Sequence, residues 1–249
     1  MATQKGILKV KGTIGGITFY QTSDGYLVRE KGGVDPSRIK KDPRFARTRE
    51  NMEEFKSAAK AGKLLRDSVR GLMAYASDKR VTARLTQLMS HVLKHDAINF
   101  RGRRVPVQGL TTTDGRGLLN GFNFNNASVL GAVLFKQWTL NTATGVISIA
   151  DFNPTEHLAV PEGATHFSMC GAMEIIDFDT RIWDVRLTNV VNAAITNGVS
   201  QIALTPVALP AGTGIKLHYL KIEFFQMVNA MQYQLRNGMF NVLSIIAVV

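Results

Sequence analysis

The stretch Gly214-Ile-Lys-Leu-His-Tyr-Leu-Lys-Ile-Glu-Phe-Phe225 is rich in β-branched and aromatic residues and predicts a strand. Similar runs, separated by turn residues, recur after about residue 129. They cover residues 133–140, 146–152, 166–176, 181–187, 201–207, 231–235 and 239–248. Thr144-Gly145 and Asn237-Gly238 are hairpin signals between them. About eight short antiparallel strands indicate a β-sandwich, of which the jelly roll is one form.

The N-terminal part is expected to begin with strands. Residues 6–12 alternate apolar with basic residues, and residues 13–20 are also strand-like. The Asp24-Gly25 pair, between residues 17–20 and 26–29, is typical of a hairpin turn. An isolated hairpin is marginal in water, so this one must pack on its own chain or on a neighbouring subunit.

Helical patterns follow the hairpin. Asp42-Pro43 predicts a helix start, because Asp is a favoured N-cap and Pro suits the first helical position. Apolar residues recur at helical spacing beyond it, with a bend or break expected at Gly62. Ser77-Asp78 predicts the cap of a further helix that ends near His95. Two or three amphipathic helices are therefore expected.

These patterns predict an α+β protein with three parts. Residues 1–104 form a basic hairpin-and-helix region, and residues 129–249 form the antiparallel β-sandwich domain. Residues 105–128 are rich in Gly, Asn and Thr but also contain leucines and aromatic residues. We expect them to form an ordered connector that lies against the body of the protein.

Charge is distributed unevenly along the chain. Residues 1–104 carry 23 Lys/Arg and 10 Asp/Glu, whereas residues 105–249 carry 7 and 9. A strongly basic part indicates an acidic surface or polymer as its partner. The basic residues expected to contact nucleic acid or another subunit are Arg38, Lys40, Lys41, Arg44, Arg47, Arg49, Arg101, Arg103 and Arg104. The alternative is that they solvate a helical face and pair with nearby acidic residues.

No residue cluster indicates a reaction. His91 and His95 could share a helix face, but no third ligand has suitable spacing, so a solvated or capping role is favoured. Cys170 is the only cysteine and is expected to be a buried structural thiol. An acidic group without the spacing of a Ca²⁺ loop is expected to serve turns and caps. It consists of Glu174, Asp177, Asp179 and Asp184. We expect no enzyme activity, cofactor, metal or small-molecule substrate.

Targeting signals are also missing from the sequence as given. No apolar run of signal-peptide length follows Met1, and no window reaches the roughly 18 to 20 apolar residues of a membrane span. The expected location is the cytoplasm or a particle assembled inside the cell, without a membrane partner.

The N-terminal pattern resembles that of uncharacterised bacterial proteins, some of phage or mobile-element origin. It consists of Gly6 to Tyr20, Arg29 and the helix entrance Asp42-Pro-Arg-Phe-Ala-Arg-Thr-Arg-Glu50. The resemblance implies a self-assembling or virion-type component and transfers no functional residues.

The sequence thus predicts a structural protein that forms a homo-oligomer, such as a filament, tube or shell. Hairpin edges, helix stripes and the charge asymmetry would join its subunits. One alternative is a nucleic-acid-binding protein that uses the basic N-terminal region. A second alternative is a β-sandwich that binds a ligand, as such folds often do.

Overall fold

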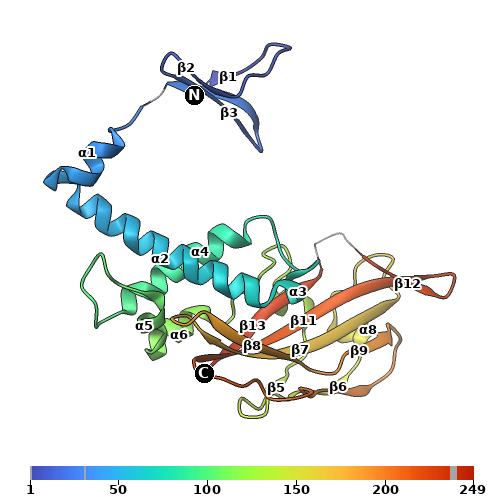
Figure 1. Ribbon diagram of the computed structural model, residues 1–249. Helices are drawn as coiled ribbons and strands as arrows, with labels where there is room; N and C mark the ends of the chain where they lie inside the picture. The colour runs from blue at the N-terminus through green and yellow to red at the C-terminus, as the bar shows by residue number, and fades with distance from the viewer. Residues whose placement is uncertain (1, 31, 236–239) are drawn as a thin grey trace. The chain divides into compact units, whose positions relative to one another are not determined.

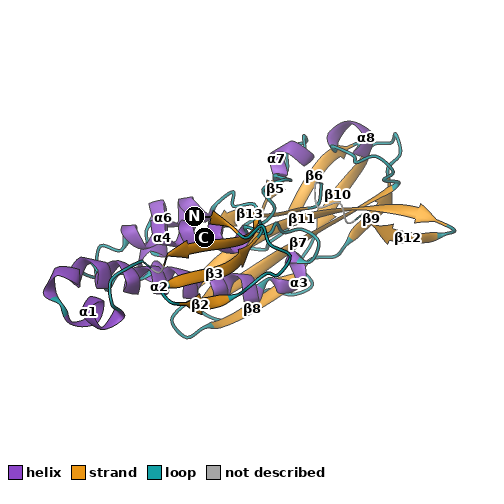
Figure 2. Ribbon diagram, turned by 90° about the horizontal axis from the view of Figure 1, so that it is seen from above, coloured by secondary structure: helices purple, strands orange, loops and turns teal. Residues whose placement is uncertain are grey.

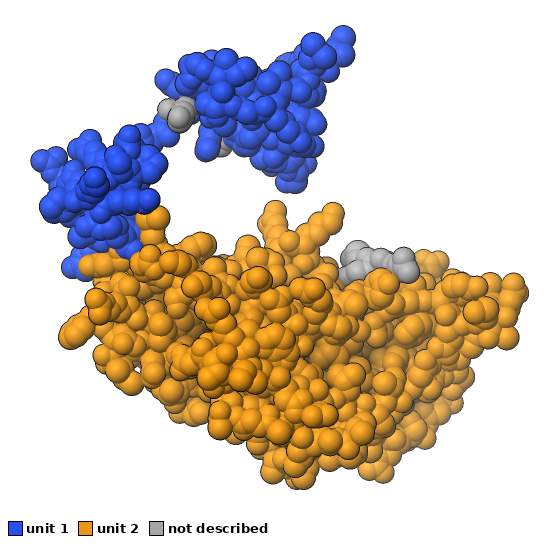
Figure 3. All heavy atoms as spheres, viewed as in Figure 1, with its two compact units in different colours: residues 1–49 blue, residues 50–249 orange. Residues whose placement is uncertain are grey.

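The computed structural model describes residues 2–30, 32–235 and 240–249 (Figure 1). The predicted α+β class is confirmed: N-terminal strands precede several helices and C-terminal antiparallel sheets. The chain divides into two compact units, Met1–Arg49 and Glu50–Val249, called unit 1 and unit 2 below (Figure 3). This division does not coincide with the predicted boundary at residue 104, because helices after Glu50 share a hydrophobic core with the C-terminal sheet.

Unit 1 begins with a four-stranded antiparallel sheet in the order β1-β4-β3-β2. Its strands are β1 (Ala2–Thr3), β2 (Gly12–Ile14), β3 (Ile17–Thr22) and β4 (Gly25–Glu30). The predicted hairpin is confirmed, since β3 and β4 pair along their whole length. Its turn places Gly25 at a φ of 114°, and the Asp24 N–H donates to Thr22 Oγ1 over 3.2 Å.

The prediction of a strand over residues 6–12 is wrong for most of that segment. The side chain of Gln4 takes the place of a partner strand: its Oε1 accepts from the Val10 N–H over 2.9 Å, and its Nε2 donates to the Val10 carbonyl over 3.1 Å. Residues 13–20 do not form one strand either. Gly15 and Gly16, at φ angles of 54° and 85°, turn the chain between β2 and β3.

The helix predicted from Asp42-Pro43 is confirmed. A short 3₁₀ turn, η1 (Pro43–Phe45), leads into α2 (Ala46–Ser68), and Asp42 Oδ1 accepts from the Arg44 N–H over 2.9 Å. A second Asp-Pro pair, Asp35-Pro36, also begins a helix, and this helix was not predicted. Asp35 caps α1 (Pro36–Lys41) by accepting from the Ser37 N–H over 2.7 Å. Unit 1 therefore ends in helical turns that each begin with an Asp-Pro pair.

In unit 2 the predicted break at Gly62 is wrong, because α2 is continuous to Ser68. A Cβ on Gly62 would lie 3.5 Å from Leu85 Cγ, an ordinary van der Waals contact, so this position packs against α4 (Val81–Val92) within a continuous helix. The predicted cap at Ser77-Asp78 is wrong: Asp78 accepts from the Arg80 N–H over 2.6 Å in the turn before α4, but Arg80 is the N-cap residue and no side chain caps the helix. The other helical segments are α3 (Arg70–Met73), α4 (Val81–Val92), η2 (Leu93–His95), α5 (Pro106–Leu110), α6 (Thr113–Leu119), α7 (Leu130–Val133) and α8 (Pro154–His157).

The C-terminal strands form two antiparallel sheets. The strands are β5 (Thr139–Leu140), β6 (Ile147–Phe152), β7 (His166–Asp177), β8 (Ile182–Leu187), β9 (Val191–Ala194), β10 (Ser200–Leu204), β11 (Ile215–Val228), β12 (Met231–Gln234) and β13 (Val242–Val248). Six of them form the order β12-β11-β7-β8, with β13 also on β11 and β9 also on β7, and three form β10-β6-β5.

Most strand predictions are confirmed, with two differences, and the first residue of the strand predicted over 239–248 lies outside the described residues. Residues 133–140 hold the end of α7 and the two-residue strand β5 instead of one strand, and β9 was not predicted. The Asn237-Gly238 signal lies outside the described residues.

The central sheet is covered on both faces along β7, β11 and β13, which are largely buried, whereas β8, β9 and β12 contain no buried residue. Helices cover one face, as Figures 1 and 2 show, and the residues of α2 and α4 share a core with Ala172, Tyr219 and Ile245. The smaller sheet covers the other face, where Ile149 and Ile202 pack with Phe224. The two sheets therefore form a sandwich with a helical layer on its outer side.

The predicted connector is ordered and lies against the body of unit 2, as expected. Leu110, Leu119 and Phe124 are fully buried in the helix-facing core. Its two short helices, α5 and α6, were not predicted.

Candidate functional surfaces

The sheet of unit 1 has no core of its own. None of the described residues between Ala2 and Arg49 is buried. Ile7 and Leu8, in the loop before β2, are almost fully exposed, and Ile14 keeps 66% of its surface accessible. A small sheet without a hydrophobic layer is marginally stable in water. Unit 1 therefore needs apolar contacts with a surface outside unit 1.

The strand register gives this sheet one mainly apolar and one mainly polar face. Residues paired across neighbouring strands point to the same side. Ile14 pairs with Ile17 and Phe19 with Val28, which places four large apolar side chains on one face, together with Glu30 opposite Ile17. The opposite face carries the Thr13–Thr18 pair, with hydroxyl oxygens 3.3 Å apart, the Thr18–Arg29 pair and the Tyr20–Leu27 pair. The apolar face is thus an unpartnered surface within unit 1.

Basic side chains surround this sheet. The ammonium groups of Lys9 and Lys11 lie 5.8 and 5.7 Å from the ring centre of Tyr26, whose pairing with Gln21 places it on the apolar face. Unit 1 as a whole carries 11 Lys/Arg and 4 Asp/Glu. The positive charge of unit 1 therefore favours an acidic surface as the partner that covers the apolar face.

Six of the predicted contact residues lie at α1, η1 and the start of α2, all in unit 1. Two of them serve the local fold. Arg49 donates to the carbonyls of Ile39 and Asp42 over 2.8 and 2.9 Å, and Arg38 pairs with Asp42 over 3.3 Å. The other four side chains are exposed, namely those of Lys40, Lys41, Arg44 and Arg47.

The other three predicted residues lie in a loop of unit 2 beside α2. Arg101 pairs with Glu50 over 3.5 Å, Arg103 is exposed, and Arg104 is half-buried. The Gly102 N–H donates to Glu54 over 2.7 Å and so holds this loop to the helix. The predicted basic set is therefore divided between the two units.

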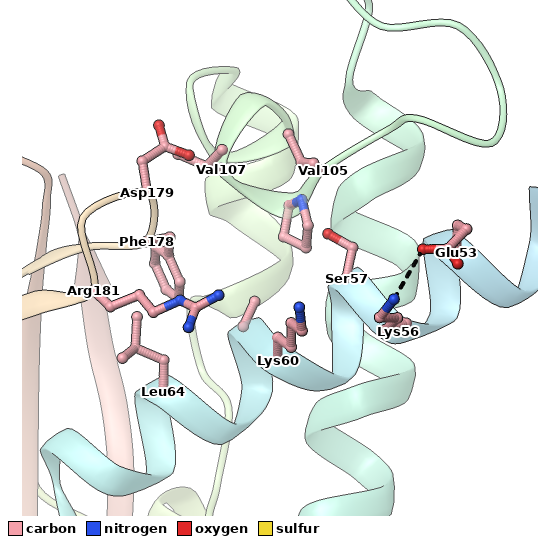
Figure 4. Close-up of a pocket in the computed structure, with 12 residues that line it drawn as sticks. Glu53, Lys56, Ser57, Lys60, Leu64, Val105, Val107, Phe178, Asp179 and Arg181 are labelled. Carbon is pink, nitrogen blue, oxygen red and sulfur yellow. Dashed lines mark hydrogen bonds and ion pairs between the residues drawn. The ribbon is translucent and has the colours of Figure 1, made fainter.

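Unit 2 has a pocket of about 310 Å³ between α2, α5 and the turn that joins β7 to β8 (Figure 4). Lys60 and Arg181 extend into the same space, while Lys56 pairs with Glu53 over 3.3 Å. This rim is polar and mainly basic. It does not match the apolar pocket with convergent acidic or aromatic groups that a ligand-binding sandwich would offer.

The acidic group of the β half is not a single site. Asp177 closes a turn by accepting from the Asp179 and Thr180 N–H groups, and Asp184 accepts from the Ala211 N–H over 2.9 Å. The predicted turn role is thus confirmed for Asp177, whereas Asp184 lies in β8 and binds a distant loop. Glu174 differs, since it is fully buried beneath the helices.

The predicted histidine pair is not brought into a metal cluster. His91 lies on α4 and is exposed, and His95 lies in η2. In the part of the chain that the structure describes, no group of three His, Cys, Asp or Glu side chains is placed to hold a metal ion.

Glu174, Tyr219 and His218 are buried titratable groups on the central sheet, whereas Cys170, predicted to be buried, is only half-buried. The Tyr219 hydroxyl donates to Glu174 Oε2, and burial raises the pKa of Glu174 to about 7, although the side chains of Ser68 and Tyr219 oppose the shift. Burial, assisted by the charge of Lys216, lowers the pKa of His218 to about 4. Burial raises the pKa of the Cys170 thiol to about 11, as a structural thiol requires.

No family model, curated protein or solved structure matches this chain. Within the described residues, none of the helices has both the length and the apolar composition needed to cross a membrane. Candidate functions therefore depend on the surfaces described above.

Proposed function

We propose that this chain is a structural protein that assembles with copies of itself, and that unit 1 forms its core only when it docks on a neighbouring subunit. The observation that carries the proposal is the four-stranded sheet with an apolar face and no buried residue. Such a sheet gains stability when a neighbour removes its apolar side chains from water. A filament or shell component assembled inside the cell, of virion type and without catalytic activity, fits this behaviour.

The edge strands support the same proposal. β1 and β2 are the outer strands of the sheet and have only two and three residues. Each has one neighbouring strand, so its other edge offers backbone groups to a further strand. Docking of the apolar face and pairing at an edge could both contribute to the contact between subunits.

Replacing the Ile14–Ile17 pair by asparagines is expected to abolish assembly. The double variant Ile14→Asn, Ile17→Asn puts polar side chains on the apolar face, and we expect association to weaken at least about tenfold. Sedimentation velocity of the wild type and the variant, with electron microscopy of the same samples, measures the effect. Circular dichroism checks that unit 2 stays folded.

The matched control replaces the cross-strand pair on the other face. Thr13→Asn, Thr18→Asn makes the same change of β propensity in the same two strands. It should leave association within about twofold of the wild type, because those side chains lie on the polar face. A wild-type chain that stays monomeric at high micromolar concentration, or equal effects of both double variants, would contradict the proposal.

Exposed cations favour nucleic acid as a second candidate partner. Lys40, Lys41 and Arg44 are exposed on consecutive helical turns. If they contact phosphates, binding to single- or double-stranded DNA should fall steeply as salt rises, and Lys40→Gln, Lys41→Gln, Arg44→Gln should reduce the salt slope. Particles that persist unchanged after nuclease treatment, with no absorbance from nucleic acid, would argue against this candidate.

A further inference from the structure

We propose that unit 1 docks on one particular surface of a second copy of this chain, the end of unit 2 that carries α8 and β12. This inference rests on the proposed function, because it names the partner of the same apolar sheet. We call this surface the acidic end and define it by residues 151–166, 191–200 and 225–235.

These three segments form one end of unit 2. Asn153 donates to Asn197 Oδ1 over 2.8 Å, which joins the first two segments. The side-chain amides of Asn192 and Gln232 donate to each other over 2.7 and 3.1 Å, which joins the second and third. Figures 1 and 2 both show α8, β9 and β12 at the same end of the sandwich.

The charge of this surface is complementary to that of unit 1. Asp151, Glu156 and Glu162 are exposed, and the three segments contain no Lys or Arg. Lys136 is the one cation on the segment that adjoins α8, where the Phe135 N–H donates to the His157 carbonyl over 2.9 Å. Among the described residues of this end, carboxylates therefore outnumber cations, whereas unit 1 has 11 cationic and 4 acidic residues.

The acidic end also exposes apolar side chains that a docked sheet could cover. Val199 keeps 70% and Met231 62% of its surface accessible. Val228 and Tyr233 are also exposed. A surface with apolar side chains framed by carboxylates is suited to an apolar sheet framed by lysines.

Some other exposed apolar groups of unit 2 lie beside cations, although Val190, Val207 and Leu209 have no Lys or Arg next to them in the sequence. Ile182 and Trp183 directly follow Arg181, and Phe100 directly precedes Arg101. Arginines at those places would repel a basic unit 1, so charge selects the acidic end among these surfaces.

The position of this end within unit 2 predicts an open assembly. Unit 2 begins near the start of α2, at the end that also carries α5, and α8 lies at the opposite end (Figures 1 and 2). A chain that leaves one end of its own unit 2 and docks on the opposite end of the next makes a heterologous contact. Repeated contacts of this kind produce a head-to-tail filament unless the rotation closes a ring.

The test exchanges charges between the two surfaces. Glu156→Lys, Glu162→Lys makes the acidic end basic, and Lys9→Glu, Lys11→Glu makes the rim of the apolar sheet acidic. Each variant alone should associate at least about tenfold more weakly than the wild type. An equimolar mixture should recover assembly, because each reversed unit 1 meets a reversed end. The control Glu53→Lys, Asp179→Lys makes the same charge change elsewhere on unit 2 and should assemble like the wild type.

The outcomes separate this inference from the proposed function. If Glu156→Lys, Glu162→Lys assembles normally while Ile14→Asn, Ile17→Asn does not, unit 1 docks elsewhere and the present inference is overturned. A monomeric wild type would overturn both. Zero-length cross-linking of a mixture of isotope-labelled and unlabelled full-length chains gives a second readout. Intermolecular links from Lys9 or Lys11 to Glu156 or Glu162 would support the inference, and links confined to other carboxylates would contradict it.

Discussion

Replacing Gly109 by Ala is expected to destabilise unit 2 by about 4 kcal/mol, because there is no room for a methyl group. A Cβ on Gly109 would lie 2.1 Å from the backbone carbonyl oxygen of Val92. The obstacle is backbone, which cannot rotate away as a side chain could. Relief requires α5 to move off the end of α4, and this movement would expose Leu110 and Val92, both of which are fully buried.

Urea unfolding of the full-length protein, followed by circular dichroism, measures this loss. Gly117→Ala is the matched control, since Gly117 lies on α6 and a Cβ there would meet no atom within 4 Å. That substitution should stabilise the protein by about 0.5 to 1 kcal/mol through helix propensity. If Gly109→Ala and the wild type unfold at the same urea concentration, α5 does not pack on Val92 as described.

Replacing Glu174 by Gln is expected to stabilise unit 2 by about 3 kcal/mol at about pH 8. The carboxyl group is fully buried with a pKa raised by burial from 4.5 to about 7. Between these values a rising pH ionises the unfolded chain but not the folded one, so the free energy of unfolding falls as pH rises. Gln keeps an acceptor for the Tyr219 hydroxyl and cannot ionise. The variant and the wild type should therefore be almost equally stable below about pH 4.5.

Thermal unfolding across a range of pH checks this prediction, with Glu156→Gln as the control at an exposed carboxyl. A difference between Glu174→Gln and the wild type that does not change with pH would contradict the assignment of a buried, titrating carboxyl. Loss of stability in the variant at high pH would contradict it as well.

His218 should produce the opposite pH dependence. Its pKa is lowered from 6.5 to about 4, so as pH falls through this range the unfolded chain gains a proton that the folded chain does not. The neutral, buried His218 therefore leaves the free energy of unfolding highest above pH 6.5, and this free energy falls as pH drops toward about 4. In the wild type this slope partly offsets that of Glu174, and Glu174→Gln should expose a decline of stability toward acidic pH.

The strands of the central sheet could be predicted because their signals are local. Residues 166–176 and 214–225 combine β-branched and aromatic residues, and both proved to be long, paired strands. The Asp42-Pro43 helix start and the Asp24-Gly25 turn were also predictable, because a cap or a tight turn is satisfied by residues a few positions away.

Predictions failed where a contact with a distant residue decided the conformation. Gly62 was expected to break α2, but Leu85 packs against it and the helix continues. The two short helices of the connector, α5 and α6, had no sufficient local signal, since helices of this length depend on tertiary packing. Glu174 was grouped with surface acids, although the alternation along β7 directs it beneath the helices beside Tyr219.

The candidate contact residues show the same limit. Composition located the basic part of the chain, but the hydrogen bonds from Arg49 to Ile39 and Asp42 were not predictable from charge. The acidic end combines segments that lie far apart in the sequence, so no single motif could reveal it.

The sequence by itself determined the α+β class, the positions of most strands and the charge asymmetry, because these depend on residue type and on spacing within short segments. Only the tertiary structure decided that helices after Glu50 share a core with the sheet, that the described part of unit 1 buries no residue, and that α8 and α5 lie at opposite ends of unit 2. These properties arise when side chains from distant segments pack together to exclude water, and the order of residues along the chain does not reveal which segments meet.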